Sequence, residues 1–183
     1  MLWSRVAAEG SSEVATKSEL LTGQAQIRWT MLRAHLDWLK EQGVDPSAAL
    51  VSHLPPDVAQ NITRSIALSP WVSLRSLIAV DRAIAAVVKM PSDQVYRELG
   101  RFSATSNLGG VYSAFASADP HQFFTKQAML HRSFQNFGAS AYQEKSPRAG
   151  VMRLTKYTEY SPVFCLSAVG YYQQPAAQFS AVA

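Results

Sequence analysis

The chain has almost none of the cysteine that disulfides and metal clusters require. Cys165 is the only cysteine, which excludes an intrachain disulfide and a cysteine-based zinc cluster. A protein without disulfides suits a reducing compartment, so we expect a cytoplasmic location. The first residues also lack the charged start and long apolar core of a signal peptide.

Long apolar runs and clustered charges are missing as well. No stretch approaches the ~20 apolar residues of a membrane span, so we expect none. The 17 basic and 13 acidic residues give a formal net charge of +4, and no run of Lys or Arg exceeds two. Basic residues spread this sparsely along the chain predict a slightly basic solvated surface and no nucleic-acid partner.

What the chain does have is apolar surface. Apolar residues make up 48% of the 183 positions and charged residues only 16%, enough for one core but little charge for a monomer. We therefore expect a homo-oligomer or association with another protein. Residues 1–24, rich in Ser, Glu, Ala, Thr and Gly, are predicted to form a flexible N-terminal extension, and residues 25–183 a single domain.

Most of this domain has the hydrophobic period of helices. The segment from Leu74 to Lys89 is the cleanest, and a helix opening at Asp119-Pro120 is predicted to run to about Asn136. Glycine or proline is predicted to end three of the helices, at Gly43, Gly138 and Pro175. The predicted helices cover residues 27–40, 58–66, 74–89, a segment from 92 towards the glycines at 109–110, a short one ending near 118, 120–136 and 162–174.

Near the C-terminus the hydrophobic period changes from that of a helix to the two-residue period of a strand. Residues 139–145 and 151–157 predict two strands joined by a turn at 146–150. An isolated hairpin is marginal in water, so it must pack on the helices, pair with another chain, or await strands that this chain lacks. The predicted fold class is α+β, a mainly helical layer packed on a small antiparallel sheet that another chain could complete.

Several short segments together resemble a known family. In order they are Leu54-Pro55-Pro56, Ser69-Pro70-Trp71, Asp81-Arg82-Ala83-Ile84, Arg97-Glu98-Leu99-Gly100, Asn107-Leu108-Gly109-Gly110-Val111-Tyr112, Asp119-Pro120-His121 and Val151-Met152-Arg153-Leu154. The set resembles an uncharacterised myxobacterial paralogous family over roughly residues 27–170. That family is distantly similar to 4-vinyl-reductase-like, haem nitric-oxide-binding-like and TRAPP-like (vesicle-tethering) domains.

The resemblance implies an α+β fold and a role in small-molecule sensing or assembly rather than turnover. Two departures limit it. Family members continue past the last helix into two further strands, whereas this sequence stops at residues 178–183, so the domain is truncated or its sheet is completed otherwise. The Tyr-x-Ser-x-Arg signature that contacts haem propionates is missing, so haem does not carry over and any cofactor is unknown.

Two polar residues stand out on apolar helix faces. Asp81 lies between Ile78 and Ile84, and a carboxylate there needs a partner. Either a neighbouring arginine, Arg75 or Arg82, pairs with it, or it anchors a ligand or transfers a proton. His131 lies beside a phenylalanine-rich face, either as a half-buried histidine with a hydrogen-bond partner or as a polar handle or haem ligand in an apolar pocket.

A metal site is not predicted. His121 and His131 are ten residues apart on one expected helix, about 15 Å along its axis, too far for a shared ion. Cys165 near the start of the last helix is expected to be a small buried apolar residue, since no second reactive group lies near it in sequence. Neither a nucleophile elbow nor a paired-carboxylate motif is present, so we expect no enzyme.

Aromatic residues supply the remaining candidates. A pocket between the helical layer and the hairpin would be lined by aromatic side chains with one or two polar groups. The candidate ligand-binding residues are Trp71, Asp81, Tyr112, Phe124 and His131. The first hypothesis is a sensory or regulatory domain that binds a small, largely apolar ligand and acts through self-association. The alternatives are a ligand-free scaffold and, by superfamily analogy alone, an enzyme of tetrapyrrole chemistry.

Overall fold

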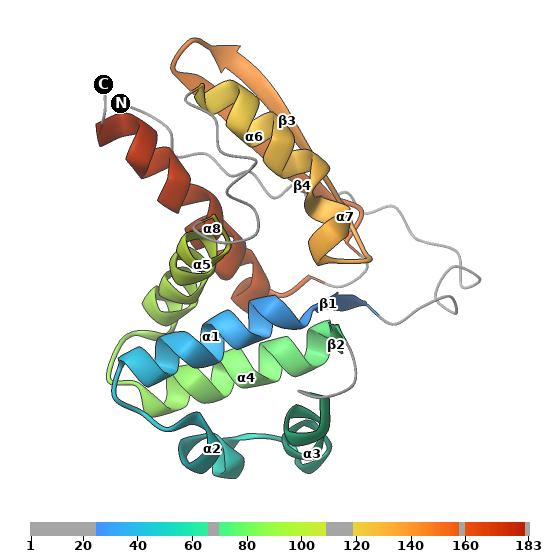
Figure 1. Cartoon of the computed structure of the whole chain (residues 1–183), viewed down its shortest axis with the longest axis vertical. Coiled ribbons are helices and arrows are strands. Elements are labelled where there is room, and N and C mark those ends of the chain that lie inside the picture. The colour runs from blue at the N-terminus through green and yellow to red at the C-terminus, as the bar shows by residue number, and fades with distance from the viewer. Residues whose placement is uncertain (1–24, 66–69, 109–118, 158–159, 182–183) are drawn as a thin grey trace, which may run out of the picture.

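The computed structural model describes residues 25–65, 70–108, 119–157 and 160–181 (Figure 1). The predicted extension at 1–24 and the predicted short helix ending near 118 lie outside these residues. The mainly helical α+β class is confirmed. In chain order the elements are β1 (Gln26–Arg28), α1 (Trp29–Glu41), α2 (Pro46–Ala49), a 3-10 turn η2 (Val51–His53), α3 (Pro56–Ser65), β2 (Trp71–Ser73), α4 (Leu74–Val87), α5 (Ser92–Leu108), α6 (Pro120–Met129), α7 (His131–Phe134), β3 (Ala139–Ser146), β4 (Ala149–Thr155) and α8 (Pro162–Ala181).

Helices α1 and α4 lie side by side, and their first residues are held together by β1 and β2 (Figure 1). These strands pair antiparallel, Ile27 opposite Val72, and Ile27 also forms a bridge with Gln135. The prediction of a helix from Ile27 was therefore wrong by two residues, because cross-strand pairing holds the buried Ile27 in an extended conformation. Helix α4 starts at a Ser73 cap, whose hydroxyl accepts the backbone N–H of Ser76 at 3.0 Å.

The end of α1 shows how a single glycine stops a helix. Gly43 has a φ of +76°, a region that side chains with a Cβ avoid. Its N–H donates to the Lys40 carbonyl at 2.9 Å, and the Val44 N–H donates to the Leu39 carbonyl at 3.3 Å. This pair of bonds is a Schellman motif and satisfies carbonyl groups that the helix end would otherwise leave unpaired. The predicted stop at Gly43 is confirmed.

Among the described helices, α5 and α8 share the most extensive contact, and two glycines permit it. A Cβ on Gly100 would come within 1.9 Å of the Ser167 carbonyl oxygen, and a Cβ on Gly170 within 2.0 Å of the Arg97 carbonyl oxygen. Each glycine thus lets the backbone of its own helix touch the backbone of the other. Helix α8 is apolar on all sides, which suits a helix packed between neighbours.

Two predicted helix ends were wrong. Pro175 lies inside α8, which runs on to Ala181; Pro175 and Ala176 are buried, so packing outweighs the lost backbone hydrogen bond. The helix expected from residue 120 to 136 divides into α6 and α7, and α7 stops at Phe134, four residues before Gly138. Contacts with β1 draw the chain out of the helix there, since the Asn136 N–H donates to the Gln26 carbonyl at 3.1 Å.

The predicted hairpin is present as β3 and β4, paired from Ala139 opposite Thr155 to Ser146 opposite Ala149. It packs against α6 at one end of the molecule, while α2 and α3 lie at the other end (Figure 1). The Tyr142 side chain lies directly over Gly150, where a Cβ would meet the phenol oxygen at 1.9 Å. An aromatic ring that covers a strand glycine in this way helps to fix the register of the pair.

The buried apolar side chains form two clusters. The main core lies among β1, α1, α4 and α5 and consists of Ile27, Leu32, Trp38, Leu39, Leu50, Val58, Val72, Leu74, Leu77, Val80, Ala83, Ile84, Val95, Leu99, Phe137 and Phe164. The hairpin cluster lies between α6, the hairpin and α8 and consists of Phe123, Phe124, Met152 and Ala176 with Ala128, Tyr142, Leu154, Tyr172 and Phe179 packed on it. Within the described segments, no helix has the length and apolar character needed to cross a membrane.

Candidate functional site

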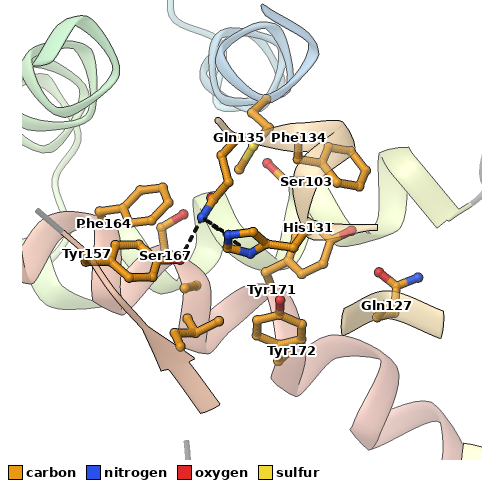
Figure 2. Close-up of a pocket in the computed structure, with 13 residues that line it drawn as sticks. Ser103, Gln127, His131, Phe134, Gln135, Tyr157, Phe164, Ser167, Tyr171 and Tyr172 are labelled. Carbon is orange, nitrogen blue, oxygen red and sulfur yellow. Dashed lines mark hydrogen bonds between the residues drawn. The ribbon is translucent and has the colours of Figure 1, made fainter. Parts of the chain in front are cut away.

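A pocket lies where the main core meets the hairpin cluster, and side chains from α1, α5, α6, α7, α8 and β4 line it (Figure 2). Its internal volume is about 60 Å³. A cavity needs at least about 10–15 Å³ of such volume to hold one water, so this pocket has room for more than one. Most of the wall is aromatic or aliphatic, from Met31, Phe134, Leu154, Tyr157, Phe164, Ala168, Tyr171 and Tyr172. The polar wall is formed by Ser103, Gln127, His131, Gln135 and Ser167.

The imidazole of His131 lies in the middle of these side chains, with Tyr157 and Phe164 on one side and Gln127 on the other in the view of Figure 2. Its Nε2 lies 2.9 Å from the Phe137 carbonyl oxygen. A carbonyl only accepts, so Nε2 carries the hydrogen and donates it. The lone pair therefore stays on Nδ1. The amide nitrogen of Gln135 lies 3.0 Å from Nε2 and 3.4 Å from Nδ1, and of these two atoms only Nδ1 can accept its hydrogen.

Gln135 fixes the other side of this network. Its amide nitrogen donates to the Tyr157 hydroxyl at 2.7 Å (Figure 2). The Tyr157 ring meets His131 edge-on, with 6.3 Å between ring centroids, and meets Phe137 edge-on at 5.3 Å. Polar and aromatic contacts together hold His131 in one orientation, so this wall of the pocket is preorganised.

Burial keeps the titratable side chains of the pocket uncharged near neutral pH. It lowers the pKa of His131 below the usual 6.5, so the imidazole is neutral at pH 7. Burial also raises the pKa of Tyr157 to about 12 and raises that of Tyr172. Among the described residues that line the pocket there is no Asp, Glu, Lys or Arg. The described wall of the pocket is therefore uncharged near neutral pH.

Two polar atoms in the wall lack a partner within the described structure. They are the Ser103 hydroxyl and the Gln127 amide nitrogen, on side chains that are 1% and 4% exposed. Thr105, on the same helix as Ser103, donates its hydroxyl to the Arg101 carbonyl one turn back, whereas Ser103 makes no such bond. A buried polar group without a partner costs about 1–3 kcal/mol. These two groups therefore call for a hydrogen-bonding partner inside the pocket, either water or a polar group of a ligand.

Haem, which the resemblance raised, does not fit. An internal volume of about 60 Å³ is far too small for a tetrapyrrole. The described lining holds no Arg or Lys to pair with propionates, and His131 Nε2 is already engaged with the Phe137 carbonyl. Iron bound to a histidine nitrogen needs that nitrogen's lone pair. Nor do the described residues contain a group of three His, Cys, Asp or Glu able to hold a metal ion.

Asp81 lies outside this pocket, in a buried pair with His35. Its Oδ1 lies 2.6 Å from Nδ1 of His35, joining α4 to α1, and both residues are 0% exposed. The expected pairing with Arg75 or Arg82 is wrong, because Asp81 points into the core and not towards the exposed arginines on the same helix. In the part of the chain that is described, His35 Nε2 and Asp81 Oδ2 have no hydrogen-bond partner. An aspartate–histidine pair can orient a catalytic base, but full burial keeps substrates away from this one.

The other candidates also lie apart. Trp71 stacks under the guanidinium of Arg28, 4.3 Å from its ring centroid, and Arg28 also donates to the Ser133 carbonyl at 2.9 Å. Phe124 is in the hairpin cluster, stacked on Tyr142 with centroids 5.5 Å apart. Tyr112 lies outside the described residues. Of the four candidates that the structure describes, His131 alone lines this pocket.

The sequence contained a signal for the polar residues that were not among the candidates. His35 is three residues after Leu32 and four before Leu39, which places it on the buried stripe of α1. Gln127 is on the apolar face that Phe123 starts, and Ser103 is beside Phe102 of the α5 stripe. Polar side chains within the apolar stripe of a helix therefore indicated both the His35–Asp81 pair and the pocket around His131. No family model, no curated protein and no solved structure matches this chain.

Proposed function

We propose that this chain is a non-enzymatic sensory or regulatory domain that binds a small molecule in the pocket around His131. The observation that carries the proposal is the pair of buried groups without partners, Ser103 and Gln127, in an aromatic wall. A pocket of this composition is typical of ligand sites, where apolar area supplies affinity and a few polar groups fix orientation. A cytoplasmic location suits such a sensor.

The described wall of the pocket lacks a nucleophile paired with a general base, which supports binding over catalysis. In the described wall, His131 is the one side chain typical of a general base. Its Nε2 hydrogen is held by the Phe137 carbonyl. Cys165 is not part of the described lining, and burial raises the pKa of its thiol, which disfavours the reactive thiolate.

Native mass spectrometry of the purified protein tests the proposal. We expect a small molecule that leaves on denaturation, or thermal stabilisation when a ligand is supplied. Ala168→Leu places extra volume in the pocket wall and should abolish binding. Ala177→Leu, at an exposed position of the same helix, is the matched control and should bind as the parent does. Equal binding by the parent and the filled variant would contradict the proposal.

A second candidate is a scaffold that associates with another copy of this chain through its hairpin. The supporting observation is that, in the described structure, β3 and β4 pair only with each other, so each strand has an edge without a strand partner. Such edges accept strands from other chains. Self-association of this kind would also complete the small sheet and transmit ligand binding.

Light scattering after size-exclusion chromatography tests this candidate. A dimer whose dissociation increases in Ala141→Lys would support the hairpin as the interface, because a lysine on an exposed strand position opposes edge pairing. Ala48→Lys, an exposed position on α2, is the control with the same charge change. A monomer at all concentrations, or a dimer equally sensitive to both variants, would remove the hairpin as the interface.

A further inference from the structure

The pocket around His131 also limits which molecules can enter it. We infer that its ligand is an uncharged compound of about three non-hydrogen atoms that carries both a hydrogen-bond acceptor and a hydrogen-bond donor, as formamide and ethanol do. This class rests on the proposed function and narrows it. Three properties of the described lining lead to it, namely its volume, its charge and its unpartnered polar groups.

The volume of the pocket sets the upper limit on ligand size. A buried apolar cavity of about 150 Å³ holds one benzene molecule, which corresponds to about 25 Å³ for each non-hydrogen atom. At the same density, the internal volume of about 60 Å³ holds about two or three such atoms. Aromatic rings, acyl chains and tetrapyrroles therefore exceed this space, whereas formamide and ethanol are at its limit.

The described lining offers no charge to pair with an ion. It contains no Asp, Glu, Lys or Arg, and burial lowers the pKa of His131, so its imidazole is neutral at pH 7. An ionic ligand would lose its hydration without gaining a counter-charge, and removing an unpaired ion from water is costly. Carboxylates, phosphates and ammonium compounds are thus disfavoured.

The polar groups without a partner determine which uncharged compounds fit. The Ser103 hydroxyl on α5 and the Gln127 amide nitrogen on α6 both belong to the pocket wall (Figure 2), and within the described structure neither has a hydrogen-bond partner. The amide nitrogen only donates, so it calls for an acceptor on the ligand, and the hydroxyl can accept a hydrogen that the ligand donates. A hydrocarbon would leave both groups unsatisfied, whereas a compound with an acceptor and a donor can bind to each.

Three probes of nearly equal size and shape test the charge of the ligand. Formamide is uncharged, formate carries a negative charge, and formamidinium carries a positive charge. Titration of the full chain, followed by NMR chemical shifts, measures their binding. The usual limit on binding free energy per non-hydrogen atom gives formamide a dissociation constant of about 0.5 mM or weaker. Formate and formamidinium should bind roughly a hundredfold more weakly, because each would bury an unpaired charge.

Two further uncharged probes test hydrogen bonding and size in the same titration. Acetonitrile has as many non-hydrogen atoms as formamide and an acceptor, but it has no N–H or O–H group. It should bind about fivefold more weakly than formamide, the usual effect of one missing hydrogen bond. Benzamide carries the amide group of formamide on a ring that exceeds the volume of the pocket, so it should not bind there.

Variants then locate the contacts. Gln127→Leu and Ser103→Ala should each weaken formamide binding about fivefold, because each removes one hydrogen bond to the ligand. Thr105→Ala on α5 removes a hydroxyl that already has a partner and should leave formamide binding unchanged. Ala168→Leu, which fills the pocket, should abolish formamide binding.

The outcomes distinguish a wrong ligand class from a wrong site. If formate, formamidinium or benzamide binds as tightly as formamide and Ala168→Leu abolishes that binding, the pocket is a ligand site and the assigned class is wrong. Formamide binding that is equally insensitive to Gln127→Leu, Ser103→Ala and Thr105→Ala would also overturn the class. If none of the probes binds, water alone satisfies the two polar groups, and both the class and the pocket as a small-molecule site are overturned.

Discussion

The molecule contains two buried histidines in contrasting surroundings. His35 is paired with a carboxylate in the middle of the main core and has no exposed surface, whereas His131 is bonded to a backbone carbonyl in the wall of a pocket. Both lie on apolar helix faces, and Met31, one turn before His35 on α1, reaches the wall of that pocket. A polar residue on the apolar stripe of a helix therefore indicates burial, and its tertiary neighbours determine whether it forms a structural pair or part of a ligand site.

The largest expected effect comes from breaking the pair in the main core. Asp81→Ala leaves the His35 imidazole buried without its partner, which should lower the free energy of unfolding by about 3–5 kcal/mol. Urea denaturation followed by circular dichroism measures it. The double variant His35→Leu/Asp81→Leu should recover most of that loss, because two apolar residues need no partner. A single variant within about 1 kcal/mol of the parent would show that the pair contributes little.

Removing the histidine of the pocket should lower the free energy of unfolding by less than breaking the pair in the main core. His131→Ala removes the bond to the Phe137 carbonyl, which should lower the free energy of unfolding by about 1–3 kcal/mol. Water can enter the adjacent pocket and bind the freed groups, an option that the core around His35 does not offer. The same urea experiment compares the two. A loss for His131→Ala equal to that of Asp81→Ala would contradict the contrast between an open site and a closed one.

The pH dependence of stability should identify His131 by its sign. Burial lowers its folded pKa below the unfolded value, so between these two pKa values the unfolded chain binds more protons than the folded chain. The free energy of unfolding should therefore rise with pH across that window and level off above about pH 6.5. Its slope is at most about 1.4 kcal/mol per pH unit. Urea denaturation from pH 5 to 8 should show this component in the parent and lack it in His131→Gln.

The smallest stability effects should come from the groups proposed to bind the ligand. Ser103→Ala and Gln127→Leu remove polar groups that have no partner in the described structure, so the ligand-free protein should be unchanged or more stable by up to about 1 kcal/mol. Thermal denaturation without ligand measures this. Binding should fall in the same variants, which separates a site kept for function from one kept for stability. A clear loss of stability would indicate that these groups have structural partners.

The sequence predicted the periodic parts of the fold well and the junctions poorly. The stop at Gly43, the Asp119 cap and the hairpin were predictable because each depends on a few neighbouring residues. The start of α1 was missed because Ile27 pairs with Val72, and the passage of α8 through Pro175 was missed because packing against neighbouring elements overrides a local preference. Of the site, His131 was named in advance, but Ser103, Gln127 and Tyr157 were not.

The mainly helical class, the absence of an intrachain disulfide and the polar residues on apolar helix faces could all be predicted from the sequence, because composition and hydrophobic period are local properties. The pairing of Asp81 with His35 and the bond from His131 to the Phe137 carbonyl became visible only in the folded chain. The same holds for the close approach of α5 and α8 at Gly100 and Gly170. Contacts between residues distant in the sequence depend on how the helices pack, and packing geometry is set by the whole chain together.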